Sequence, residues 1–131
     1  MNKIVFVCLG NICRSPMAEF VMKELDQEKS LHIESRATSS WEHGNSVHQG
    51  TQKILREYAI SFDSSKGSQQ ISQADFEFFD LVVGMDESNV EDLLQISAGR
   101  YDDKIKLFRP GGVPDPWYTG DFEETYKLVT A

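Results

Sequence analysis

Short apolar runs and stripes of apolar residues at helical spacing alternate along the whole chain. The first run, residues 3–8, is rich in β-branched and aromatic residues, as is typical of a buried parallel strand. Beyond a loop, apolar residues from Met17 to Leu25 recur on one face of a helix. We expect Ser15 to cap this helix and Pro16 to be its first residue.

The alternation continues towards the C-terminus. Asp86 begins a helix with negative charge in its first turn. Residues 109–120 hold three of the four prolines and are expected to form a long loop. Asp121 then caps a last helix, with Glu124 as its capping partner. Further strands are expected at residues 32–38, 80–85 and 104–107, and further helices at about 47–58 and 74–79.

Strands that alternate with helices predict an α/β fold. We expect a three-layer domain, with a central four-stranded parallel sheet flanked by helices. Without repeats or an internal boundary, residues 1–131 are expected to form a single domain. The last helix reaches Ala131 without a stop signal, so a truncated helix and a frayed end both stay open.

Composition narrows the possible partners. The net charge of −8 argues against nucleic acid, which is bound by surplus lysine and arginine. It also repels anions, so any anion site must be a preorganised pocket. No apolar run is long enough to cross a bilayer or to form a secretory signal, so we expect a cytoplasmic protein without a membrane partner. The oligomeric state stays open, with a monomer favoured.

Cys8 and Cys13 are the two cysteines of the chain. A disulfide between them would close a very short loop and add little stability. A zinc site is not expected, because no second cysteine pair exists and the three histidines are distant in sequence. In the cytoplasm, two nearby cysteines favour catalysis or redox control.

The loop after the first strand combines several features of an anion site. Ligands of open parallel sheets bind outside the carboxyl ends of the strands, and a helix N-terminus attracts phosphate. Gly10 and Asn11 tolerate the left-handed backbone of a tight curl. Cys8 is expected to be a thiolate next to Arg14, which can hold two phosphate oxygens, and Ser15 could donate its hydroxyl to the sulfur. We therefore predict a phosphate-binding loop, although a cysteine at a strand end is often only a core residue.

The segment from Val7 to Glu19 resembles the signature of the low-molecular-weight protein tyrosine phosphatases. Matches at residues 75–76, 85–89 and 115–118 extend the resemblance over nearly the whole chain. It implies a protein tyrosine phosphatase that works without metal or cofactor through a phosphocysteine intermediate. Its substrate would be a phosphotyrosine protein, and a tyrosine kinase is one candidate.

The resemblance also implies roles for individual residues. Cys8 would be the nucleophile, Arg14 the phosphate clamp and Asp115 the general acid and base, although an aspartate before proline is also a common turn residue. Cys13 could form a reversible disulfide with Cys8 or be a passive thiol. The remaining phosphate-binding residues would be Leu9, Gly10, Asn11, Ile12, Cys13 and Ser15, and the substrate cleft would be lined by Trp41, Trp117 and Tyr118, with Leu9 and Ile12 at its floor.

Some positions depart from the family pattern. The second strand ends Ser-Arg-Ala-Thr at residues 35–38, where Ser-Ala-Gly-Thr is usual. Lys66 and Gln69 stand in place of a histidine and an arginine, and His48 and Gly50 in place of aspartate and arginine. These changes concern residues expected to support the phosphate loop.

Three alternatives differ in the reaction. A thioredoxin-coupled arsenate reductase needs two further cysteines downstream, and none follows Cys13. A phosphoarginine phosphatase tends to carry threonine where Ile12 stands. A non-catalytic phosphate-binding module would not need both Arg14 and Asp115.

Overall fold

The computed structural model describes residues 2–26, 28 and 30–130. Within these residues, four parallel strands form one sheet in the order β2-β1-β3-β4. The predicted α/β fold is therefore confirmed. The strands are β1 (Lys3–Cys8), β2 (His32–Ala37), β3 (Leu81–Gly84) and β4 (Ile105–Leu107).

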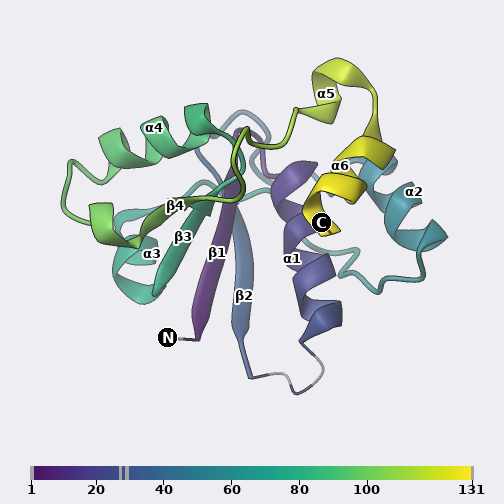
Figure 1. The fold of residues 1–131 in the computed structure, drawn as a ribbon, viewed down its shortest axis with the longest axis horizontal. Coiled ribbons are helices and arrows are strands. Elements are labelled where there is room, and N and C mark those ends of the chain that lie inside the picture. The colour runs from purple at the N-terminus through teal and green to yellow at the C-terminus, as the bar shows by residue number, and fades with distance from the viewer. Residues whose placement is uncertain (1, 27, 29, 131) are drawn as a thin grey trace.

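Helices cover both faces of the sheet and make three layers (Figure 1). Helices α1, α2 and α6 lie on one face, and α3 and α4 lie on the other. None of the helices in the described part of the chain is long and apolar enough to cross a membrane. Their bounds are α1 (Arg14–Leu25), α2 (Gln49–Glu57), α3 (Gln73–Phe78), α4 (Glu87–Ile96), α5 (Pro116–Thr119) and α6 (Phe122–Thr130), with a 3-10 turn at Asp102–Lys104.

Strand β1 is central and buried on both sides. Val5 and Val7 point into the core under α3 and α4, whereas Phe6 and Cys8 point into the core under α1 and α2. This alternation explains the uninterrupted apolar run, because a strand covered on both faces has no polar side. The strand ends at Cys8, and the loop that follows lies beyond the carboxyl ends of the parallel strands.

Some local predictions were wrong. Helix α1 begins at Arg14 and not after Ser15, and its N-cap residue, Cys13, makes no capping hydrogen bond through its side chain. The hydroxyl of Ser15 instead contacts the loop before the helix, at Cys8 and Asn11. The expected loop before the last helix contains the short helix α5, which begins at Pro116.

The predicted cap of the last helix is half right. The carboxylate of Asp121 accepts a hydrogen bond from the backbone N–H of Glu124 at 2.9 Å. The N–H of Asp121 donates to the hydroxyl of Thr119 at 3.1 Å, so Glu124 does not return the bond. The predicted end of this helix at Ala131 lies outside the described residues.

Candidate active site

The loop between β1 and α1 is shaped by one left-handed residue. Asn11 has a φ of 57°, as its residue type predicted. Gly10 does not adopt a positive φ, so Asn11 is the one of the two that supplies the left-handed turn. A Cβ atom at Gly10 would lie 3.3 Å from Cγ of Glu42, so the glycine lets the neighbouring loop approach closely.

The side chain of Asn11 is buried and holds the curl from four directions. Its amide nitrogen donates to the hydroxyls of Ser15 at 2.8 Å and Ser35 at 2.9 Å. Its amide oxygen accepts from the backbone N–H of Gln69 at 3.2 Å and from Nζ of Lys66 at 3.3 Å. A buried amide with these partners has little freedom to move, so it fixes the loop.

The sulfur of Cys8 lies inside this curl. It is 3.1 Å from the hydroxyl oxygen of Ser15 and accepts a hydrogen bond from the backbone N–H of Asn11 at 3.3 Å. The Ser15 oxygen accepts from the Asn11 amide, and its single hydrogen can point either at the sulfur or at the backbone carbonyl of Arg36, 3.4 Å away. Two groups that can donate hydrogen bonds therefore lie against the sulfur.

Arg14 is buried beside the loop, with 2% of its side chain exposed. Its Nη1 atom donates to Asp86 at 2.6 Å and to the carbonyl of Val113 at 3.0 Å, and Nη2 lies 3.5 Å from Asp115. Nε has no hydrogen-bond partner among the described residues. Burial alone would lower the pKa of Arg14, but the negative charges of Cys8, Asp86 and Asp115 outweigh it and raise that pKa.

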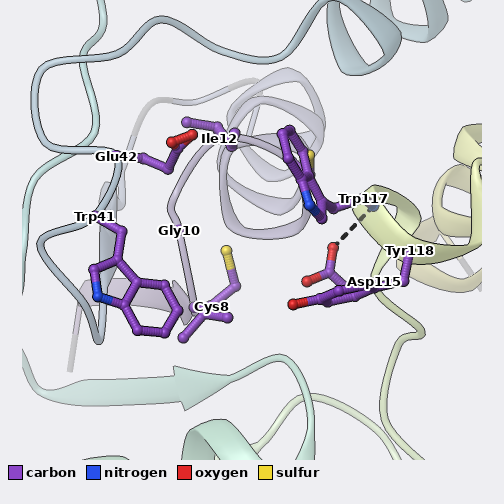
Figure 2. Close-up of a pocket in the computed structure, with 10 residues that line it drawn as sticks. Cys8, Gly10, Ile12, Trp41, Glu42, Asp115, Trp117 and Tyr118 are labelled. Carbon is purple, nitrogen blue, oxygen red and sulfur yellow. Dashed lines mark hydrogen bonds between the residues drawn. The ribbon is translucent and has the colours of Figure 1, made fainter.

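A cavity of about 200 Å³ opens above the sulfur (Figure 2). Asp115 lies at its side as the N-cap residue of α5, where its carboxylate accepts the N–H of Trp117 at 3.0 Å. Trp41 faces Trp117 and Tyr118 across Cys8. The structure thus brings together residues predicted for the site, and the full lining is Cys8, Leu9, Gly10, Ile12, Cys13, Trp41, Glu42, Asp115, Trp117 and Tyr118.

Comparison with protein families shows to which family the chain belongs. Residues 3–131 match the family model described as low molecular weight phosphotyrosine protein phosphatase. The chain belongs to this family.

Members of the low-molecular-weight phosphatase family resemble the chain in sequence and in fold. The Bacillus subtilis (strain 168) low molecular weight protein-tyrosine-phosphatase YfkJ is 40% identical over 140 residues, which cover 98% of this chain and 89% of YfkJ. PtpA of Staphylococcus aureus (strain Newman), which bears the same enzyme name, is 39% identical over 98% of this chain and 87% of its own. The crystal structure of SP-PTP, a low molecular weight protein tyrosine phosphatase from Streptococcus pyogenes, gives a TM-score of 0.96 at 61% identity, covering 98% of this chain and 86% of SP-PTP.

This member of the family keeps its second loop cysteine as a thiol. Cys8 and Cys13 are both free and buried. Burial, with a smaller contribution from the negative charge of Cys8, raises the pKa of the Cys13 thiol. Cys13 therefore stays protonated at neutral pH.

Two of the residues that depart from the family pattern, Lys66 and Arg36, form ion pairs in the structure. Nζ of Lys66 lies 3.7 Å from a carboxylate oxygen of the buried Glu19, and that oxygen also accepts from the Ser35 hydroxyl at 2.5 Å. Burial lowers the pKa of Lys66, although Glu19 opposes the shift. On the opposite face of the sheet, Arg36 donates to Asp75 of α3 at 3.3 Å. Support of the phosphate loop is thus retained with different residues.

Sequence reasoning missed two residues of this phosphatase site. Asp86 was interpreted as the start of a helix and as part of the family match at residues 85–89, but its contact with Arg14 was not predicted. Apart from that match, nothing in the sequence marks a contact across 72 residues. Glu42 lines the cavity and follows Trp41 directly, which was the one available signal.

Proposed function

We propose that the protein hydrolyses phosphotyrosine in proteins through a phosphocysteine intermediate. In this proposal Cys8 is the nucleophile, Arg14 binds the phosphate, and Asp115 is the general acid and base. The observation that carries it is the meeting of a buried sulfur, a buried guanidinium and a carboxylate at one cavity. Membership of the phosphatase family supports the same chemistry.

The loop has the groups that a phosphate dianion needs. The backbone N–H groups of Gly10, Ile12 and Cys13 have no protein acceptor within the described residues. They lie just before the first turn of α1, where the helix dipole favours an anion. Together with the unpaired Nε of Arg14, they would surround the equatorial oxygens during transfer. This local site attracts an anion in spite of the net charge of −8.

The first step transfers the phosphoryl group to sulfur. The thiolate of Cys8 attacks phosphorus in line, the S–P bond forms, and the bond from phosphorus to the tyrosine oxygen breaks. Tyrosine has a pKa of about 10, so its oxygen leaves more readily when it receives a proton. Protonated Asp115 would donate that proton, because it lines the cavity beside the sulfur.

The second step returns the enzyme to its starting state. The Asp115 carboxylate would take a proton from a water molecule, and the water oxygen would attack phosphorus. The S–P bond breaks, inorganic phosphate leaves, and the electron pair of the bond stays on Cys8 as a thiolate. The Ser15 hydroxyl at 3.1 Å would stabilise this leaving thiolate.

The walls of the cavity favour an aromatic phosphate ester. Trp41, Trp117 and Tyr118 expose 77%, 58% and 75% of their surface and surround the opening. Aromatic walls bind a flat ring and make the sulfur hard to reach for the shorter phosphoserine. Ile12, an apolar residue at the cavity, favours phosphotyrosine over phosphoarginine. The substrate would be a phosphotyrosine protein, with a tyrosine kinase as one candidate.

The cysteines favour a reducing compartment. Oxidation would convert the nucleophilic thiolate of Cys8 into an inactive form. Cys13, a second free thiol in the same loop, is a partner with which Cys8 could form a disulfide. The reducing cytoplasm keeps such thiols active. We therefore place the reaction in the cytoplasm.

Hydrolysis of an aryl phosphate without added metal tests the proposal. The wild type is expected to release phosphate, and Cys8→Ser is expected to show no turnover. Asp115→Ala should lose about 10²–10⁴-fold in rate, and the loss should shrink when the leaving group is better. Turnover by Cys8→Ser would contradict the mechanism. Parallel assays with phosphoarginine and arsenate separate the alternative reactions.

A further inference from the structure

We infer that three rings in contact, those of Phe122 and Trp117 on either side of His48, position the segment that carries Asp115 against the phosphate loop. We call these three residues the ring lock. The inference rests on the proposed role of Asp115 as the general acid. It gives a function to two of the departures from the family pattern, His48 and Gly50.

The ring of Phe122 occupies the space that a side chain at position 50 would fill. A Cβ atom built on Gly50 would lie 2.5 Å from the Cε2 and Cζ atoms of Phe122. Real atoms do not approach so closely, so a larger residue at position 50 excludes the ring from this place. Gly50 and the position of Phe122 therefore depend on each other.

His48 connects Phe122 with the phosphate loop. Its imidazole stacks on the Phe122 ring, with centroids 4.9 Å apart and planes 21° apart. Its Nδ1 accepts the backbone N–H of Gly50 at 3.0 Å, which fixes the orientation of the imidazole. Its backbone N–H donates to the carbonyl of Ile12 at 2.8 Å. The residue that holds Phe122 is thus bonded to the loop around the nucleophile.

Trp117 connects the same imidazole with the acid. Its ring meets His48 edge-on, with centroids 5.7 Å apart and an angle of 86°. Its backbone N–H donates to the Asp115 carboxylate at 3.0 Å. The turn between Trp117 and Phe122 is completed by Gly120, whose φ of 73° ends α5. The segment 115–122 is therefore held against His48 at two points.

The contact between Arg14 and Asp115 is too weak to fix the position of the acid, and the ring lock fixes it instead. Asp115 touches Arg14 only at 3.5 Å, a weak hydrogen bond. A short helix of four residues has little stability of its own, and both tryptophan and tyrosine on it are largely exposed. Packing of Phe122 and Trp117 on His48 therefore sets the position of Asp115 relative to Cys8.

Gly50→Ala is the sharpest test, because alanine favours a helix more than glycine does and the change leaves α2 intact. We expect the added methyl to displace Phe122. The value of kcat/KM should fall about tenfold for phenyl phosphate, whose leaving group needs a proton, and less than about twofold for p-nitrophenyl phosphate, whose leaving group does not. Phe122→Ala should act in the same way. Inhibition by inorganic phosphate should be unchanged, since it reports on the phosphate loop.

Tyr126→Ala is the matched control. It removes an aromatic ring from the same helix, α6, but that ring stacks on Tyr58 at 3.9 Å and lies outside the ring lock. The ratio of the two kcat/KM values should stay as in the wild type. In the double variant with Asp115→Ala, Gly50→Ala should cause no further loss, because both changes act through the same carboxyl group.

Two outcomes would overturn the inference and are distinguishable. If Asp115→Ala kept the wild-type dependence on the leaving group, the acid assignment would fail and the inference with it. In the second outcome, Asp115→Ala behaves as expected, but Gly50→Ala and Phe122→Ala lower kcat/KM equally for both substrates or not at all. This result would refute the ring lock alone.

Discussion

Oδ2 of Asp86 lies 2.6 Å from Nη1 of Arg14, while Oδ1 of the same carboxylate accepts the N–H of Asn89 at 2.8 Å and caps α4. One side chain thus orients the guanidinium at the start of α1 and caps the helix that follows β3. We expect Asp86→Asn to lower the free energy of unfolding by about 1–3 kcal/mol, because Arg14 loses its charged partner while the cap is kept.

Asp86→Ala separates the two roles. It also removes the cap and should cost about 1 kcal/mol more than Asp86→Asn. Urea unfolding at pH 7 measures both values, and the KM for an aryl phosphate should rise in both variants as Arg14 loses its fixed orientation. If Asp86→Asn were as stable as the wild type, the ion pair would contribute nothing to the fold.

Ser15→Ala tests the hydrogen bond to the sulfur. A hydrogen bond to a charged group contributes about 1.5–3 kcal/mol, which corresponds to a fall in kcat of roughly 10–100-fold. The loss should appear in the second step, where the thiolate of Cys8 leaves phosphorus. Burst kinetics with p-nitrophenyl phosphate measure that step separately.

Ser68→Ala is the control for this prediction. The Ser68 hydroxyl donates to the carbonyl of Gly10 at 2.7 Å, so it supports the same loop without touching the sulfur. It should leave the rate of the second step within about fivefold of the wild type, since a neutral hydrogen bond contributes only about 1 kcal/mol. An equal loss in both variants would mean that Ser15 acts only on the shape of the loop.

Lys66→Met tests the support of Asn11 by a residue that departs from the family pattern. The ammonium contacts the Asn11 amide oxygen at 3.3 Å and the Ser35 carbonyl at 3.4 Å. Because Gln69 still binds the same amide oxygen, kcat/KM should fall only about fivefold, as for one lost hydrogen bond. Lys66→Arg should recover part of the activity, and an inactive Lys66→Met with a native fold would show that Lys66 does more than support Asn11.

Glu34→Gln gives a pH-dependent change in stability. Partial burial opposes the shift, but hydrogen bonds from His32 and Arg36 outweigh it and lower the pKa of Glu34 from its usual 4.5. The folded state therefore favours the charged carboxylate, and its stabilising effect is fully present above pH 4.5 and is lost as the pH falls through the lower, folded-state value.

Thermal unfolding of the wild type and Glu34→Gln across this range measures the effect. The wild type should be the more stable protein at pH 7, and the difference should vanish in acid. It should also shrink with added salt, since Glu34 is partly exposed. A difference that did not change with pH would show that the charge of Glu34 is not its cause.

The sheet and the loop could be predicted because their signals are local. A run covered on both faces, as in β1, is apolar from Ile4 to Cys8, and the left-handed Asn11 and Arg14 follow within a few residues. Helix α5 could not be predicted, because four residues are too few to show helical spacing. Ser15 was misplaced as a cap because its hydroxyl lies against the sulfur of Cys8 and binds no N–H of the helix.

Contacts across long stretches of sequence were beyond prediction. The pairing of Arg14 with Asp86 and the stacking of His48 on Phe122 each join residues more than 70 positions apart. Periodicity and spacing describe neighbours along the chain, and only the fold brings such residues together. The family resemblance named Asp115, but it did not reveal how that residue is held.

The central place of β1 has a consequence during synthesis. Cys8 leaves the ribosome before β2 and β3 do, so its strand must wait for β2 and then for β3 before both of its edges are paired. The proposed acid, Asp115, emerges more than a hundred residues later. A growing chain therefore carries its nucleophile long before it can use it, and phosphatase activity should appear abruptly when translation of the domain is nearly finished.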